Sequence, residues 1–295
     1  MIPFSIRVYL LLIAFALVVH AQPPALTITT EPNAIVWIDE VRRGTTDASG
    51  KLALTKISAG RHTVRVRANG FKETTAALLP GRRTLAVKLV ATTDQAELTF
   101  QKAETAREQA RDDDAREKAA DLYREAIKLR PAFPAAHVGL ARVLLDLNQF
   151  KEARAEIDAA RRTKPVYPEA SAVEGRIYRE EAFADEATRS FRRAIREGAG
   201  FQPEAHVGLA RVYEDQGDFT GAAAELRKAI DQLSDSEPVI YQMLGAVYEK
   251  IEKPKEAIVA YEKYLQLAPT GSYAAAIRSI LEQLKREAAG EQIIP

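Results

Sequence analysis

The heptapeptide His137-Val-Gly-Leu-Ala-Arg-Val143 decides the fold, because it recurs without change as His206-Val-Gly-Leu-Ala-Arg-Val212. More divergent copies between and around these two give units that begin near Phe100, Pro134, Pro168, Pro203 and Pro238. The spacings between these starts are 34, 34, 35 and 35 residues. Within each unit the apolar residues recur with the period of amphipathic helices. A constant period with two helices per unit predicts a solenoid in which neighbouring units bury a shared core.

Small and large residues alternate at fixed places in the second helix of each unit. The small residue, where two helices must approach closely, is Ala119, Ala153, Ala187, Ala222 and Ala257. Four positions later stand the larger residues Tyr123, Ile157, Phe191, Leu226 and Tyr261. This pattern resembles a tetratricopeptide-repeat (TPR) array over residues 100–271. The resemblance implies a concave groove that is lined by the first helices and binds proteins.

The same resemblance divides the helical part into five units, at 100–133, 134–167, 168–202, 203–237 and 238–271. The first unit is degenerate, because alanines and Arg107 replace its usual packing residues. An apolar stripe on one side of residues 272–289 predicts a capping helix, which a solenoid needs to close its open end. Residues 290–295 form a tail.

The N-terminal part, residues 22–92, follows a different period. Apolar residues alternate with polar ones, as in Leu26 and Ile28 or in His62, Val64 and Val66, and turn signals separate the runs. Short strands at this spacing predict a small antiparallel β-sandwich, joined to the array by a linker at 93–99. The fold class is therefore multidomain α and β.

The predicted sandwich also resembles the PEGA domain of prokaryotic envelope proteins. The resemblance rests on Pro32-Asn-Ala34, Val36, Ile38, Asp39, Gly44-Thr45, Leu54, Gly60, His62, Val64, Val66 and Gly70-Phe71. Glu40 and Thr46 stand where that family often has Gly and Pro, which points to a differently built second turn. The family implies an extracytoplasmic module without catalytic residues.

The pattern of the first 21 residues predicts a signal peptide. Met1–Arg7 carries one positive side chain, and the twelve apolar residues Val8–Val19 follow it. As a helix this run would span about 18 Å, well short of a hydrocarbon core of about 30 Å. Val19-His20-Ala21 fits a signal-peptidase site, so we expect cleavage near Ala21 and a periplasmic or secreted protein. The alternative is an uncleaved anchor that extends from Ile2 onward.

The sequence offers little for catalysis or cofactor binding. It has no cysteine, no Gly-rich phosphate loop and no His-rich metal spacing, so we predict no enzyme activity and no cofactor or metal. His62, His137 and His206 are expected to be packing residues. The run Asp112–Asp114 is expected to cap a second helix rather than bind a cation.

Charged residues at matching positions are the candidate partner-binding site. The ninth residue of units two, three and four is arginine, and the residue four positions later is acidic, on the same helix face. These six are Arg142, Arg176 and Arg211, with Asp146, Glu180 and Asp215. Two interpretations stay open. These arginines and acids form ion pairs with one another within and between units, or some of the arginines are available to a partner's carboxylate.

The net charge of the two parts differs in sign. Residues 22–92 hold 11 Lys or Arg against 5 Asp or Glu, and residues 93–295 hold 30 against 36. Trp37, Arg65 and Arg67 share the outward face of the predicted strands. This face is a candidate contact surface, a surface that docks onto the acidic array, or a solvated face.

Together these features predict an exported, non-enzymatic scaffold or adaptor of the bacterial cell envelope that binds a protein or peptide through the concave groove. The alternative is a cell-wall or glycan-binding protein that uses the PEGA-like domain, with the array as spacer. The total formal charge of +1 gives no sign of a nucleic-acid partner. No stable membrane span is expected after cleavage.

Overall fold

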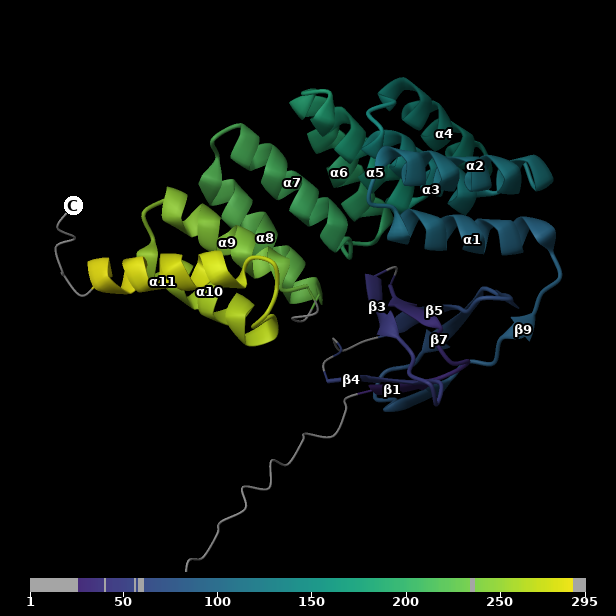
Figure 1. Cartoon of the computed structure of the whole chain (residues 1–295), viewed down its shortest axis with the longest axis horizontal. Coiled ribbons are helices and arrows are strands. Elements are labelled where there is room, and N and C mark those ends of the chain that lie inside the picture. The colour runs from purple at the N-terminus through teal and green to yellow at the C-terminus, as the bar shows by residue number, and fades with distance from the viewer. Residues whose placement is uncertain (1–25, 40, 56, 58–60, 234–236, 289–295) are drawn as a thin grey trace, which may run out of the picture.

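The computed structural model describes residues 26–39, 41–55, 57, 61–233 and 237–288. A β-domain over the N-terminal part lies next to the first helix of a helical array, and the last helix lies at the far end of that array (Figure 1). The predicted signal peptide at 1–21 and the tail at 290–295 fall outside the described residues. No helix among the residues described is long and apolar enough to cross a bilayer.

The β-domain has two principal sheets of short strands. Its strands are β1 (Leu26–Thr29), β2 (Ile35–Ile38), β3 (Val41–Thr45), β4 (Lys51–Leu54), β5 (His62–Arg67), β6 (Phe71–Lys72), β7 (Thr74–Leu78), β8 (Thr84–Ala86) and β9 (Val90–Ala91). One sheet has the order β4-β1-β8, the other β3-β2-β5-β7, and β6 pairs with β9. The prediction of an all-antiparallel sandwich is wrong for one pair, since β1 and β8 are parallel. The turn at 79–83 carries the chain from one sheet to the other, so β8 runs in the direction of β1.

Alternation along the strands separates a buried face from an outer face. Val36, Val64 and Val66 are fully buried between the sheets, whereas Trp37 is paired with Arg65 on the outer face of β2 and β5. Thr46 directly follows β3. Its buried hydroxyl donates to the Glu31 carbonyl at 2.7 Å and accepts from the Ala34 amide at 2.8 Å. These bonds hold the chain after β3 against the turn that follows β1.

The helical array consists of helix pairs followed by a single helix. The pairs are α1 (Gln95–Gln109) with α2 (Asp113–Leu129), α3 (Pro134–Asp146) with α4 (Phe150–Thr163), α5 (Pro168–Glu180) with α6 (Ala184–Glu197), α7 (Pro203–Asp215) with α8 (Phe219–Leu233), and α9 (Val239–Lys250) with α10 (Pro254–Leu267). The single helix is α11 (Ala274–Ala288). The predicted linker at 93–99 is wrong, because Asp94 caps α1 and accepts from the amides of Ala96 and Glu97. Asp112 caps α2 in the same way, as predicted.

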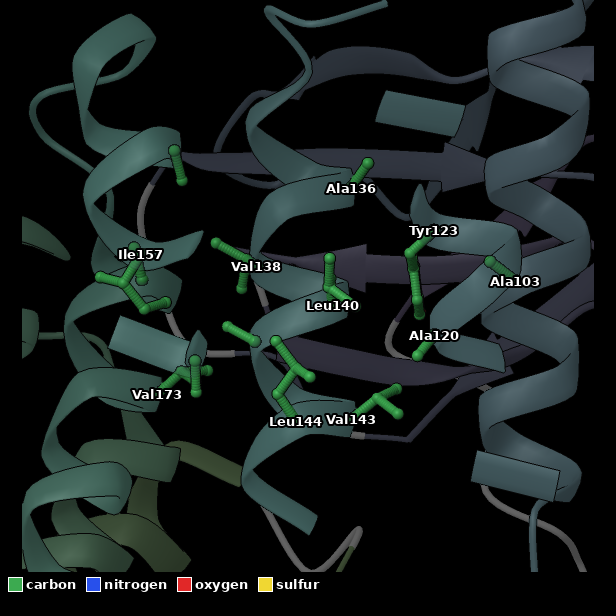
Figure 2. Close-up of a cluster of buried hydrophobic side chains, with 14 of the residues drawn as sticks. Ala103, Ala120, Tyr123, Ala136, Val138, Leu140, Val143, Leu144, Ile157 and Val173 are labelled. Carbon is green, nitrogen blue, oxygen red and sulfur yellow. The ribbon is translucent and has the colours of Figure 1, made fainter. Parts of the chain in front are cut away.

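The array core confirms the repeated packing positions. The five alanines of the second helices are fully buried, and the larger residues four positions later are at most 2% exposed. Each glycine of the repeated heptapeptide faces one of these rings: a Cβ at Gly139 would lie 2.3 Å from Tyr123, and a Cβ at Gly208 would lie 2.3 Å from Phe191. Figure 2 shows the first part of this core, where side chains of α1 to α5 meet. The repeated Gly therefore lets the ring of the preceding second helix approach the backbone.

The last helix closes the array. Ile277, Leu281 and Leu284 of α11 are buried against Tyr261 and Tyr264 of α10. This contact covers the apolar edge that the fifth pair would otherwise expose, as the one-sided apolar stripe predicted.

Candidate functional site

The β-domain is fixed to α1 by a side-chain amide. Gln101, which is 5% exposed, donates to the Phe71 carbonyl at 2.9 Å and accepts from the Gly70 amide at 2.9 Å. Gly70 has a φ of +81°, a conformation that glycine adopts readily. The tight turn between β5 and β6 therefore presents backbone groups to the array.

The outer face of β2 and β5 turns toward the helices and is not a solvated surface. The Arg65 guanidinium lies 4.1 Å from the centre of the Trp37 ring. Arg67 lies 5.0 Å from the Trp37 ring and 4.7 Å from the ring of Phe100 on α1. Arg67 thus bridges an aromatic ring of each domain through cation–π contacts. A glycan site on this face would require the two domains to separate.

Ion pairs join the same arginines to the array. Arg65 contacts Glu169 of α5 at 3.3 Å, and Arg67 contacts Glu104 of α1 at 3.3 Å. Glu73, within the β-domain, contacts both arginines, at 3.1 and 2.8 Å. The Arg67 side chain is only 9% exposed, so these pairs are shielded from water more than ordinary surface pairs. The basic β-domain has therefore docked onto acidic groups of the array.

The two array carboxylates stay ionised in this setting. Burial alone would raise the pKa of Glu104, but Arg107 and Arg67 outweigh burial and hold that pKa below its ordinary value. Burial likewise opposes the charge of Glu169, and Arg142 and Arg65 lower its pKa. Tyr123 of α2 donates a hydrogen bond to Glu104, which adds to the stabilisation of the charged form.

Arg142 belongs to this network. Its guanidinium lies 3.4 Å from Glu204 of α7, and its side chain is 20% exposed. Burial tends to lower the pKa of Arg142, but attraction to Glu204 and Glu169 raises it above the ordinary value. Arg142 is therefore held by carboxylates of this chain.

Most of the other predicted groove residues pair between units. Arg176 lies between Asp146 at 3.6 Å and Glu204 at 3.7 Å. Asp215 and Glu180 both contact Arg179, at 2.7 and 3.1 Å. The carboxylates four residues after each arginine thus pair with arginines other than their own, and Arg179 was not among the predicted site residues.

Arg211 differs from the other two arginines. It is exposed, and the structure gives it no ion pair within the described part of the chain. One turn earlier on α7 lies Val207, and Ile240 and Met243 of α9 line the same space. A cation beside aliphatic side chains is a combination that suits an amphipathic ligand.

These residues surround one cavity of about 820 Å³ between the β-domain and the array. Its walls come from β2, β3 and β5 and from the first helices α1, α3, α5, α7 and α9. The end next to the β-domain is lined by paired charges, and the end at α7 and α9 is lined by Arg211 and apolar side chains. The cavity is large enough for a few residues of a peptide.

Three glutamates of this site were not among the residues predicted from the sequence. Glu104, Glu169 and Glu204 supply the carboxylates that hold Arg67, Arg65 and Arg142. Glu169 and Glu204 both stand at the second position of a first helix, directly after a proline. This repeated Pro-Glu pair was the feature of the sequence that could have identified them. An acid in a first helical turn also favours the helix dipole, so the pattern alone does not separate the two roles.

The three histidines in the described part of the chain are packing residues that pair with carboxylates. The Nδ1 atoms of His137 and His206 each lie 2.6 Å from a glutamate nineteen residues later, Glu156 and Glu225. His62 Nδ1 lies 2.6 Å from Asp39. Among the described residues, no group of three His, Asp or Glu side chains is placed to hold a metal ion.

Family models for the tetratricopeptide repeat match residues 110–177, 173–238 and 238–270. Residues 110–270 are a TPR array. The predicted repeat family is therefore confirmed, and α1, which precedes the matched residues, extends the same stacking toward the β-domain.

Solved structures support the same fold. The chain is similar to TTC0263, a TPR protein of Thermus thermophilus, with a TM-score of 0.54 and 22% identity over 64% of this chain and 98% of that one. It is also similar to pilF of Pseudomonas aeruginosa, with a TM-score of 0.55 and 16% identity over 66% of this chain and 86% of that one. At these identities the likeness concerns the fold alone. No curated protein matches the chain significantly.

Proposed function

We propose that this protein is an exported, non-enzymatic scaffold of the bacterial cell envelope that binds a partner protein in the cavity between its two domains. The TPR fold supports a role in protein interaction. The observation that carries the proposal is the cavity of about 820 Å³, whose walls combine charged and aliphatic side chains from both domains.

The export part of the proposal rests on the sequence. Residues 1–21 have the pattern of a cleavable signal peptide, and the β-domain resembles PEGA modules of envelope proteins. N-terminal sequencing of the protein from its native cell should give Gln22 as the first residue, in the soluble extracytoplasmic fraction. An intact Met1 in the membrane pellet would contradict cleavage.

Site-specific photo-crosslinking in the native cell tests the binding site. A photo-crosslinking amino acid in place of Met243 lies in the cavity, and the same amino acid in place of Arg189 lies on the exposed outer face of α6, where the side chain is 69% exposed. The Met243 position should capture one defined partner segment that the Arg189 position does not capture. Equal capture at both positions, or capture at Arg189 alone, would contradict binding in the cavity.

A further inference from the structure

Position two and position nine of successive first helices form a repeating pair. Arg176, at position nine of the third unit, lies 3.7 Å from Glu204, at position two of the fourth unit. Glu169, at position two of the third unit, attracts Arg142 of the second unit, although the ion pair of Arg142 is with Glu204 at 3.4 Å. Both arginines thus form an ion pair with Glu204, a glutamate that a later unit supplies directly after a proline.

The fifth unit breaks this pattern. Its start reads Pro238-Val239 where the third and fourth units read Pro-Glu. Val239 stands at the position of the missing glutamate and is 40% exposed. Arg211, at position nine of the fourth unit, therefore lacks the carboxylate that its counterparts receive.

Among the described residues, the nearby carboxylates do not replace it. Glu180 is bonded to Arg179 at 3.1 Å. Glu214, one turn beyond Arg211 on α7, attracts Arg211 but forms no ion pair with it in the described structure. Glu237, at the rim of the cavity, is attracted to Arg42 of β3.

We propose that the space at α7 and α9 binds a partner segment in which an Asp or Glu side chain stands next to aliphatic side chains. The partner's carboxylate takes the place of the missing glutamate and pairs with Arg211, and its aliphatic side chains pack on Val207, Val239 and Met243. Guanidinium groups bind carboxylates through two parallel hydrogen bonds, and methionine adapts to varied apolar shapes. This inference rests on the proposed function and specifies the partner chemistry.

The other end of the cavity is closed to such a segment. Arg65 and Arg67 occupy it together with Trp37, and their charges are already matched by Glu169 and Glu104. An incoming carboxylate would meet ionised glutamates there. The partner is therefore restricted to the fourth and fifth units.

A random peptide library displayed on phage is the probe. The target is the mature chain, residues 22–295, and the variants are Arg211→Ala, Val239→Glu, Val239→Gln and Met243→Asp, with Arg189→Ala as the control. Peptides selected on the unchanged chain should be enriched in an acid beside Ile, Leu or Val. Arg211→Ala should weaken their affinity about tenfold or more, because a charge-assisted contact is lost.

Val239→Glu is the sharpest variant, because it restores within the chain the glutamate that the fifth unit lacks. Val239→Glu should weaken peptide binding as strongly as Arg211→Ala. Val239→Gln should weaken it less, because glutamine has nearly the size of glutamate but carries no charge to pair with Arg211. Arg189→Ala should leave the affinity unchanged, and added salt should weaken binding to the unchanged chain.

The outcomes separate this inference from the proposed function. Peptides without acids that lose binding in Met243→Asp but not in Arg211→Ala would overturn the carboxylate pairing and leave the cavity as the binding site. Peptides that bind every variant equally, or a library that yields no peptide dependent on Met243, would overturn both.

Discussion

The two copies of the heptapeptide His137–Val143 and His206–Val212 have the same sequence and the same packing, but their arginines differ. In both copies the histidine pairs with a glutamate of the following helix at 2.6 Å. In both, the glycine contacts a buried ring of the preceding second helix. Arg142, however, lies in a network of ion pairs, whereas Arg211 is exposed without one among the residues described.

The difference separates two kinds of property. The packing of a repeat follows from its own sequence, whereas the charge environment of its arginine depends on the position of the repeat in the molecule. Packing is the same because every interior unit has similar neighbours. The charge environment of an arginine at position nine is set by the next units and by the β-domain. The units that follow Arg142 supply Glu169 and Glu204, whereas the unit that follows Arg211 has Val239 at the corresponding position.

The largest expected effect concerns what the two copies share. Gly139→Val and Gly208→Val each place a side chain where a buried ring already lies, so each should destabilise the array by about 3 kcal/mol. The loss should be similar for both and is measured by urea denaturation followed by circular dichroism. Ala224→Val, on the exposed face of α8, is the control for adding a β-branched residue. A loss confined to one copy would show that the two are not packed alike.

The second effect concerns the charge environment of the arginine, which differs between the two copies. Arg142→Ala removes one ion pair of Glu204 and a positive charge that attracts Glu169, and it should reduce the free energy of unfolding by about 1–3 kcal/mol. Arg211→Ala removes an exposed side chain and should change it by less than about 0.5 kcal/mol. Both variants are measured in the same denaturation experiment. Equal losses would remove the distinction between the two arginines.

The repeat units were predictable from sequence, because the residues that pack them recur at a constant period. The buried alanines, the larger residues four positions later and the Asp112 cap all lie where local patterns placed them. The ion pairs were not predictable in the same way. Arg142 and Glu204 are 62 residues apart and meet only because of how the first helices stack. The contact of Arg65 with Glu169 further depends on how the β-domain docks, which no periodicity encodes.

The parallel pairing of β1 with β8 was missed for a related reason. Alternation predicts which residues of a strand face the core, but it carries no information on the direction of the neighbouring strand. The turn at 79–83, which crosses between the sheets, decides that direction. The face of Trp37, Arg65 and Arg67 was identified correctly as outward, and its docking onto the acidic array was one of the alternatives that the charge difference left open.

A third prediction tests whether domain docking maintains the environment of Arg142. The pKa values of Glu104 and Glu169 lie below their ordinary value of 4.5. Arg107 and Arg142 of the array and Arg67 and Arg65 of the β-domain share in this lowering, so the loss of the two β-domain arginines makes the separated form bind protons more readily than the docked form. Docking is fully favoured above pH 4.5 and weakens as the pH falls through the lowered pKa values.

The only tryptophan of the chain, Trp37, reports this change directly, because it lies against Arg65 at the junction. Below about pH 4, its emission should shift and its quenching by acrylamide should rise while the helical circular dichroism is retained. The double variant Glu104→Gln with Glu169→Gln should show the open signal already at pH 7. A Trp37 signal that does not change until the helices unfold would show that the docking does not depend on these carboxylates.

The smallest expected effect concerns the exposed pair at the edge of the junction. Arg42 of β3 lies 3.1 Å from Glu108 of α1, and the two side chains are 49% and 37% exposed. A pair this open to water and salt contributes about 0–1 kcal/mol. A double-mutant cycle of Arg42→Ala with Glu108→Ala should therefore give a coupling energy well below that of Arg67→Ala with Glu104→Ala, since Arg67 is nearly buried. Raising the salt concentration should abolish the Arg42 coupling first. If the two cycles gave equal energies, burial would not be what separates weak from strong pairs at this junction, and the contrast between Arg142 and Arg211 would need another physical cause.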